Sequence, residues 1–249
     1  MQIVRFEDVS KIYTSGDHVL YALDHVDFSL EAEKFVVILG PSGAGKSTLL
    51  NLLGGLDSPS EGKIVVSGKD ISELTDNELA DYRASKVGFV FQFYNLIPTL
   101  TVYENVALVS EISPGALDAK EMIARVGLSD HLNNFPAELS GGEQQRISIA
   151  RAIMKDAPII ILDEATANID PENEAELTAA IEELTREKTI IMIAHRLKTV
   201  RHADRIFVVD KGRIAQAGTH EELLKKDGIY RRFVEGRREA VSWKIGAGT

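Results

Sequence analysis

The order of apolar and polar residues predicts a chain that combines strands with helices. Residues 3–9 and 26–30 alternate apolar and polar side chains, which is typical of half-exposed strands and predicts an antiparallel β layer. Other stretches are short and almost continuously apolar, as in strands buried within a parallel sheet. These stretches are residues 35–39, 87–91, 158–164 and 189–194. Residues 204–210 and 213–217 predict a closing pair of strands around a Lys-Gly turn.

The middle of the chain has helical spacing instead. Residues 102–109, 119–126 and 141–154 repeat apolar positions every three or four residues, with no strong strand signal among them. Further helices are predicted at 75–85, with Thr75 or Asp76 as the N-cap, and from Asp170 to about 185. We therefore expect one α/β domain over residues 1–249. Its sheet core and β layer would comprise residues 1–95 and 152–249, and residues 96–151 would form an inserted helical subdomain.

A glycine-rich loop joins the first buried strand to a helix. Residues 40–47, GPSGAGKS, match the pattern G-x-x-x-x-G-K-[ST] in full. Glycines let the backbone turn its N–H groups inward, and the helix adds the positive end of its dipole, so this turn predicts a triphosphate site. Lys46 would reach the β- and γ-phosphates, and Ser47 would bind Mg²⁺. The alternative is a flexible glycine turn, which the full pattern between a strand and a helix disfavours.

Polar side chains follow three of the buried strands. Gln92 ends one strand and His195 another, and each alone could be a structural strand terminus. Asp163 and Glu164 end a third, where two adjacent carboxylates predict a cation site or a protonation role. Carboxyl ends of parallel strands line one crevice of a sheet, so we expect these residues to share a site. Asp163 would hold Mg²⁺ and Glu164 would act as general base, with a plain acidic strand end as the alternative.

Two further features have a functional and a structural interpretation. Ser140, Gly141 and Gly142 precede a helix and could form a second anion site, although Ser140 is also a sufficient N-cap. A second phosphate-binding site would have little role for the same ATP molecule unless it serves a neighbouring subunit. Tyr13 lies in a polar stretch and could stack on an adenine ring, although a surface or satellite-core tyrosine is the better interpretation of that residue alone.

Composition narrows the class of protein. The 249 residues carry a formal charge of −10, which argues against broad nucleic-acid binding. No apolar run approaches the roughly 18 residues that span a bilayer, and no segment has the pattern of a secretory signal. The absence of cysteine excludes disulfides and cysteine metal sites. We expect a soluble, cytoplasmic protein.

These motifs, in this order, resemble the nucleotide-binding domain of ATP-binding-cassette (ABC) transporters over essentially the whole chain. The matching segments are GPSGAGKST, VFQ, LSGGE, ILDE, ATANID and IAH. The resemblance implies a P-loop NTPase fold with a mixed, mostly parallel sheet. It also implies ATP and Mg²⁺ as ligands, a head-to-tail homodimer around two ATP molecules, and transmembrane transporter subunits as partners at the inner or plasma membrane.

The resemblance also implies a role for each site residue. Residues expected to bind the nucleotide of their own subunit are Tyr13, which stacks on adenine, and Gly40, Ser42, Gly43, Gly45, Lys46, Ser47 and Thr48. Ser140 and Gly142 would bind the ATP of the opposite subunit. Metal ligands would be Ser47, Gln92 and Asp163. Catalysis would depend on Glu164, His195, Gln92 and Lys46, and Asp170 would lie in the loop that crosses the dimer interface.

Within the family, the resemblance changes along the chain. Up to about residue 139 it is similar to the separate ATPase subunits of macrolide-export and lipoprotein-release transporters, and from about residue 152 to the ATPase half of fused exporters. The sequence is therefore hypothesised to be an engineered hybrid joined near residues 140–151, with a natural lineage of mixed features as the alternative.

Three functions follow as hypotheses. The first is a Mg²⁺-dependent ATPase that is the motor of a transporter. The second is a scaffold that folds and binds ATP with little turnover, because an interface assembled from two lineages could fail to close. The third is a soluble ATPase of DNA repair, translation or cluster assembly, for which the chain lacks the expected long coiled coils or second cassette.

Overall fold

The structure is a computed structural model that divides into two compact units. It describes residues 1–91, 94–113, 115–163, 180–181, 187–194 and 200–236. The first unit comprises residues 1–53, 57–72 and 192–249, and the second comprises residues 54–56 and 73–191. Each unit is described by itself below. Among the described residues, no helix has the length and apolar character needed to cross a membrane.

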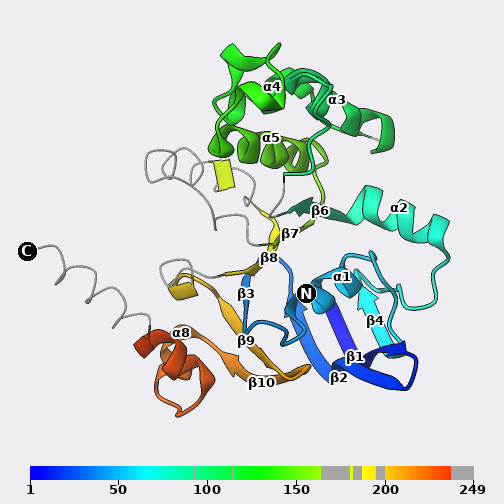
Figure 1. The fold of residues 1–249 in the computed structure, drawn as a ribbon, viewed down its shortest axis with the longest axis vertical. Helices are drawn as coiled ribbons and strands as arrows, with labels where there is room; N and C mark the ends of the chain where they lie inside the picture. The colour runs from blue at the N-terminus through cyan, green and yellow to red at the C-terminus, as the bar shows by residue number, and fades with distance from the viewer. Residues whose placement is uncertain (92–93, 114, 164–179, 182–186, 195–199, 237–249) are drawn as a thin grey trace, which may run out of the picture. The chain divides into compact units, whose positions relative to one another are not determined.

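An antiparallel sheet forms one part of the first unit (Figure 1). Its strands, in spatial order, are β2 (His18–Glu31), β1 (Gln2–Ser15), β4 (Glu61–Val66) and β5 (Lys69–Asp70). The predicted antiparallel layer is therefore confirmed. Its strands are longer than the alternating segments because the β1–β2 ladder continues through residues 10–15 and 18–25, which do not alternate regularly, and backbone pairing does not require such alternation. Register shifts between Val9 and Ile12 interrupt the alternation that sequence reasoning follows.

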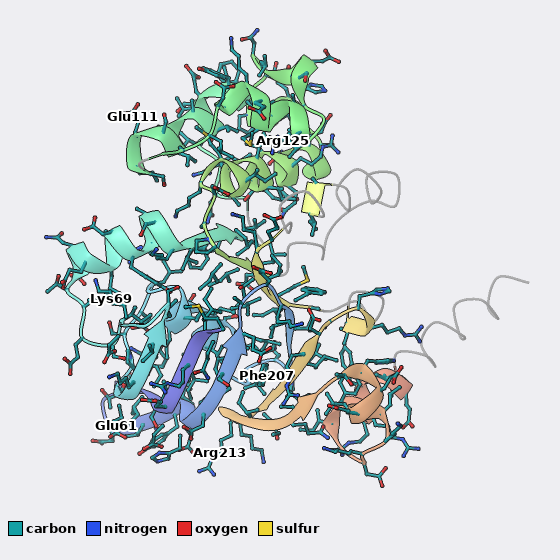
Figure 2. All side chains as sticks on the ribbon, turned by 180° about the vertical axis from the view of Figure 1, so that it is seen from behind. Glu61, Lys69, Glu111, Arg125, Phe207 and Arg213 are labelled. Carbon is teal, nitrogen blue, oxygen red and sulfur yellow. The ribbon has the colours of Figure 1, made fainter. Side chains whose placement is uncertain are left out.

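The remaining described strands of this unit support the glycine-rich loop. Strand β3 (Phe35–Leu39) pairs in parallel with β9 (Arg205–Asp210), and β9 pairs antiparallel with β10 (Arg213–Gly218). The rings of Phe28 and Phe207 lie 5.2 Å apart and connect the packing of β2 with that of β9. Phe207 is labelled among the strands in Figure 2. Helix α1 (Lys46–Leu53) follows the loop, and α8 (His220–Leu224) follows β10.

The second unit contains most of the helices that the structure describes (Figure 1). Its described helices are α2 (Asp76–Lys86), α3 (Val102–Ile112), α4 (Ala119–Arg125) and α5 (Gly141–Met154), with 3-10 turns at Ser129–His131 and Pro136–Glu138. Helix α5 packs against α3 and α4 around buried residues such as Val106, Met122 and Ile147. Strands β6 (Val87–Val90) and β7 (Ile159–Asp163) pair in parallel, and β8 (Thr189–Ile193) continues from this unit into the first.

Local sequence signals set the helix starts. Thr75, Thr101, Ser140 and Thr219 are N-caps, and each forms a capping box with a glutamate three residues later. The hydroxyl satisfies one free N–H of the first turn, and the glutamate accepts from the amide of the cap. The cap predicted at Thr75 is confirmed. Together the parallel and antiparallel pairings and the helices confirm the predicted α/β class.

Candidate functional site

The loop between β3 and α1 is shaped by two glycines that lie against other strands. A Cβ at Gly40 would lie 2.1 Å from the carbonyl oxygen of Val209 on β9. A Cβ at Gly45 would lie 2.3 Å from the carbonyl oxygen of Ala22 on β2. Both distances are far below van der Waals contact, and the φ angles of +156° and +102° also favour glycine. The curled backbone of the loop therefore depends on glycine at these two positions.

A turn distant in sequence supports the same loop. The amide of Gly212, between β9 and β10, donates a 2.9 Å hydrogen bond to the carbonyl oxygen of Ala44. The carbonyl oxygen of Gly212 accepts a 2.9 Å hydrogen bond from the amide of Asp24. Arg213, labelled in Figure 2, places Nη2 2.6 Å from Oδ2 of Asp24. Lys211 and Gly212 were predicted only as a turn, because nothing in the local sequence indicates this contact.

The chemical groups of the loop suit a polyphosphate. Ser42, Gly43 and Ser47 are exposed. Lys46 Nζ donates to the carbonyl oxygens of Gly40 and Pro41, at 3.1 and 2.9 Å, so the ammonium lies over the loop backbone. The loop leads directly into the N-terminus of α1, where backbone N–H groups and the helix dipole favour an anion. The residues present therefore fit a triphosphate, as the motif predicted.

Tyr13 is held beside α1 by its hydroxyl group. The Tyr13 hydroxyl donates a 2.9 Å hydrogen bond to Oδ2 of Asp57, and it also interacts with the side chain of Thr48 on α1. Its side chain is 42% exposed, so Tyr13 is not part of the core. Burial, and then the hydrogen bond to Asp57, raise the pKa of the Tyr13 hydroxyl. The structure thus brings Tyr13 and Thr48 together, two of the residues predicted to bind nucleotide.

Lys11 and Asp57 form a side-chain cluster with Tyr13, and the sequence did not indicate either of these two residues. Lys11 Nζ lies 2.6 Å from Oδ1 of Asp57 and 5.1 Å from the centroid of the Tyr13 ring. Burial alone would raise the pKa of Asp57, but hydrogen bonds from Lys11, Tyr13 and the Ser58 amide outweigh it and lower that pKa. Asp57 follows α1 in a turn-forming segment, where an aspartate carries no functional signal of its own.

The second predicted anion site lies in the second unit. Ser140 is exposed and caps α5, with its hydroxyl accepting from the Glu143 amide at 3.3 Å and Glu143 Oε2 accepting from the Ser140 amide at 2.7 Å. Gly142 is buried, and a Cβ at Gly141 would lie 3.0 Å from the hydroxyl of Tyr94. The N-cap interpretation is therefore confirmed, while binding of a nucleotide here stays a prediction.

The predicted metal and catalytic residues are only partly described. Asp163 is the half-buried last residue of β7 in the second unit, and Ser47 belongs to the first unit. Gln92, Glu164, Asp170 and His195 lie outside the described residues. Within the part of the chain that is described, no group of three or more His, Asp or Glu side chains could hold a metal ion. The Mg²⁺ ligands and the catalytic residues thus stay predictions.

Comparison with known proteins adds independent evidence. The family described as "ABC transporter" matches residues 23–167, more than half of the chain. An ATP-dependent lipid A-core flippase of Ralstonia nicotianae is 41% identical over 246 residues, covering 91% of this chain and 39% of the flippase. The macrolide export ATP-binding/permease protein MacB of Hyphomonas neptunium is 37% identical over 236 residues, covering 92% of this chain and 37% of MacB. The chain thus spans less than half the length of either relative.

A solved structure extends the comparison to the fold. The dimeric ATP-binding cassette MJ0796, bound to ADP and Pi in a post-hydrolysis state, superposes with a TM-score of 0.78 at 35% identity, covering 87% of this chain and 98% of that one. The flippase and MacB match across the interval in which the sequence pattern changes, and neither gives evidence that two lineages are joined there. The glycine loop, its strand and its helix occur here in the order and geometry of a P-loop, and the chain belongs to the ABC transporter family.

Proposed function

We propose that this chain binds Mg-ATP at residues 40–48 and hydrolyses it as the motor of a membrane transporter. The observation that carries the proposal is the loop in which Gly40 and Gly45 lie too close to neighbouring backbones to accept a side chain. A loop held in this form presents its amides, Lys46 and Ser47 to one anion. The solved relative with ADP and Pi supports hydrolysis as the outcome of binding.

The chain's own residues divide the chemistry as follows. Lys46 neutralises charge on the β- and γ-phosphates, while the loop amides orient them. Ser47, Asp163 and Gln92 would hold Mg²⁺, and the bound ion would supply positive charge to stabilise the phosphate oxygens. Glu164 accepts a proton from the attacking water, and His195 contacts the γ-phosphate. Because the reaction needs little covalent participation by the protein, positioning and electrostatics carry most of the rate.

A second copy of the chain completes each site in this proposal. Ser140 and Gly142 at the start of α5 would bind the ATP held by the opposite subunit. The Ser140 hydroxyl accepts from the Glu143 amide and also bonds the Glu143 carboxylate, so donation to a phosphate of the opposite ATP would replace that second bond. The dimeric MJ0796 cassette supports the arrangement. ATP would close the dimer and hydrolysis would reopen it.

The partners follow from the family. Transmembrane subunits would bind the helical subdomain and the segment around Gln92, and the chain would act at the cytoplasmic face of the inner or plasma membrane. The names of the flippase and of MacB support a transport role, while the substrate would be chosen by membrane segments. The net charge of −10 disfavours a nucleic-acid partner.

The concentration dependence of turnover tests the proposal. ATP hydrolysis should rise more than linearly with protein concentration, since each site needs two subunits, and Lys46→Ala should abolish nucleotide binding. Glu164→Gln should form a dimer on gel filtration at saturating Mg-ATP, and adding Ser140→Ala should weaken it. If the parent protein binds ATP without turnover, and its Glu164→Gln variant stays monomeric at saturating Mg-ATP, the chain is a binding scaffold instead of a motor.

A further inference from the structure

One carboxylate connects two residues of β1 with the segment that follows α1. Asp57 Oδ2 accepts from the Tyr13 hydroxyl at 2.9 Å, and Oδ1 accepts from Lys11 Nζ at 2.6 Å and from the Ser58 amide at 2.8 Å. Lys11 Nζ also donates to the carbonyl oxygen of Ser58 at 2.8 Å. With three hydrogen-bond donors on its two oxygens, Asp57 has little rotational freedom. Asp57 can therefore restrain the more exposed of its two side-chain partners, Lys11 and Tyr13.

The exposed partner of Asp57 is Tyr13. The residue is 42% exposed, whereas the side chain of Lys11 is only 13% exposed. An exposed tyrosine ring turns between rotamers unless its tip is held. The hydroxyl bond to Asp57 supplies that restraint on a residue 44 positions away. The Asp57 carboxylate thus restrains the most exposed residue of the cluster.

The cluster also orients the ring toward α1. The Tyr13 hydroxyl interacts with Thr48, which is the neighbour of Ser47 in the first turn of the helix. Lys11 Nζ lies over the ring at 5.1 Å from its centroid, so the cation occupies one face. The opposite face is then the one on which a flat base would stack.

We propose that Asp57 is a positioning residue for the nucleobase: it holds the Tyr13 ring by its hydroxyl and so raises affinity for the base of a purine nucleotide without touching the phosphates. The inference rests on the proposed binding of ATP with Tyr13 against adenine. The inference goes beyond that proposed binding because it assigns control of the base contact alone to Asp57 and Lys11. The competing explanation is an ion pair that only ties β1 to the α1–β4 segment.

Two ligands separate these explanations. The full chain would be titrated by calorimetry with Mg-ATP and, separately, with inorganic tripolyphosphate, which has the phosphates and no base. Asp57→Ala should raise the Kd for ATP by about five- to tenfold, which corresponds to the typical net contribution of about 1 kcal/mol for one intramolecular hydrogen bond. The Kd for tripolyphosphate should stay within about twofold, because the phosphate loop is not altered. A purely structural ion pair would change both constants together or neither.

A double-mutant cycle tests whether Asp57 acts through Tyr13. Tyr13→Phe keeps the ring and removes the anchored hydroxyl, so it should weaken ATP binding about as much as Asp57→Ala. The double variant should be no weaker than either single variant. Additive losses would overturn the inference, because Asp57 would then act by another route.

Asp70→Ala is the matched control. Asp70 forms a comparable ion pair with Lys63, at 3.2 Å, in the same antiparallel sheet but away from Tyr13. It should change neither Kd. Should Asp57→Ala fail to fold, as judged by urea denaturation, Asp57→Asn keeps an acceptor for Tyr13 and should give a smaller loss for ATP only. A parent that binds no ATP would overturn the proposed function itself, whereas unchanged ATP affinity in folded Asp57 variants would overturn only this inference.

Discussion

The amide of Gly212 donates a 2.9 Å hydrogen bond to the carbonyl oxygen of Ala44, which lies inside the phosphate loop. The two residues are far apart in sequence, and the bond joins the β9–β10 turn to the loop backbone. A Cβ at Gly212 would lie 3.1 Å from the carbonyl oxygen of Ala22, and φ is +77°. The turn can therefore reach the loop in this geometry only with a very small residue.

Gly212→Ala should weaken nucleotide binding. The left-handed φ costs an L-residue on the order of 1 kcal/mol, and the contact with β2 should displace the turn from Ala44. We expect a several-fold rise in the Kd for ATP by calorimetry. Gly68→Ala is the control, because its φ of +80° is matched and nothing lies within 4 Å of its Cβ position. Equal Kd values in the two variants would show that the Gly212 contact does not support the loop.

Gly45→Ala should be more damaging than Gly43→Ala. A Cβ at Gly45 would lie 2.3 Å from a backbone oxygen, while one at Gly43 would meet nothing within 4 Å. Both positions have a positive φ, at +102° and +74° respectively, so a difference in stability between the two variants measures the effect of the clash at Gly45. The free energy of unfolding, from urea denaturation, should fall by roughly 2 kcal/mol or more for Gly45→Ala and by about 1 kcal/mol for Gly43→Ala. Similar losses of stability in the two variants would mean that β2 can move enough to relieve the clash at position 45.

Asn105→Leu should destabilise the protein. Asn105 is fully buried on α3 and bonds the segment before it: its Oδ1 accepts from the Ile97 amide, and its Nδ2 donates to the carbonyl oxygens of Ile97, Leu100 and Thr101. Leucine would leave these backbone groups without their partner. We expect a loss of about 2–4 kcal/mol in urea denaturation. Asn133→Leu, at an exposed position, should change stability by less than about 0.5 kcal/mol.

Lys155 should make stability depend on pH in the alkaline range. Burial, and secondarily the charge of Arg83, lower the pKa of Lys155 from 10.5 to about 8. Between these values the unfolded chain binds more protons than the folded protein, so the free energy of unfolding rises with pH. Below about pH 8 the lysine is charged in both states, and the full cost of burying its charge remains.

Lys155→Met should remove that cost. The free energy of unfolding at pH 7 should increase by about 1–3 kcal/mol, and the part of its rise between pH 8 and 10.5 that Lys155 causes should disappear. Urea denaturation across this range measures both effects. Lys226→Met, at an exposed lysine, is the control and should keep the slope of the parent. A Lys155→Met slope equal to that of the parent would contradict the assignment.

Local sequence determined the elements and the main motif of this protein. Helix α5 spans the predicted residues 141–154, and its cap at Ser140 satisfies amides only three residues away. The phosphate loop was recognisable because its glycines, lysine and serine are contiguous and their order reflects one short turn. Such features depend on neighbours in the chain, so the pattern of residues suffices to predict them.

Tertiary structure decided which distant residues serve that motif. Gly212 supports Ala44, and Asp57 anchors Tyr13, although neither residue differs in type or spacing from an ordinary turn residue. Residues 10–15 of β1 and 18–25 of β2 likewise form strand because their backbones pair with each other, although their side chains do not alternate regularly. A hydrogen bond needs two groups within about 3 Å, and for residues this far apart only the packing of strands and helices brings them to that distance.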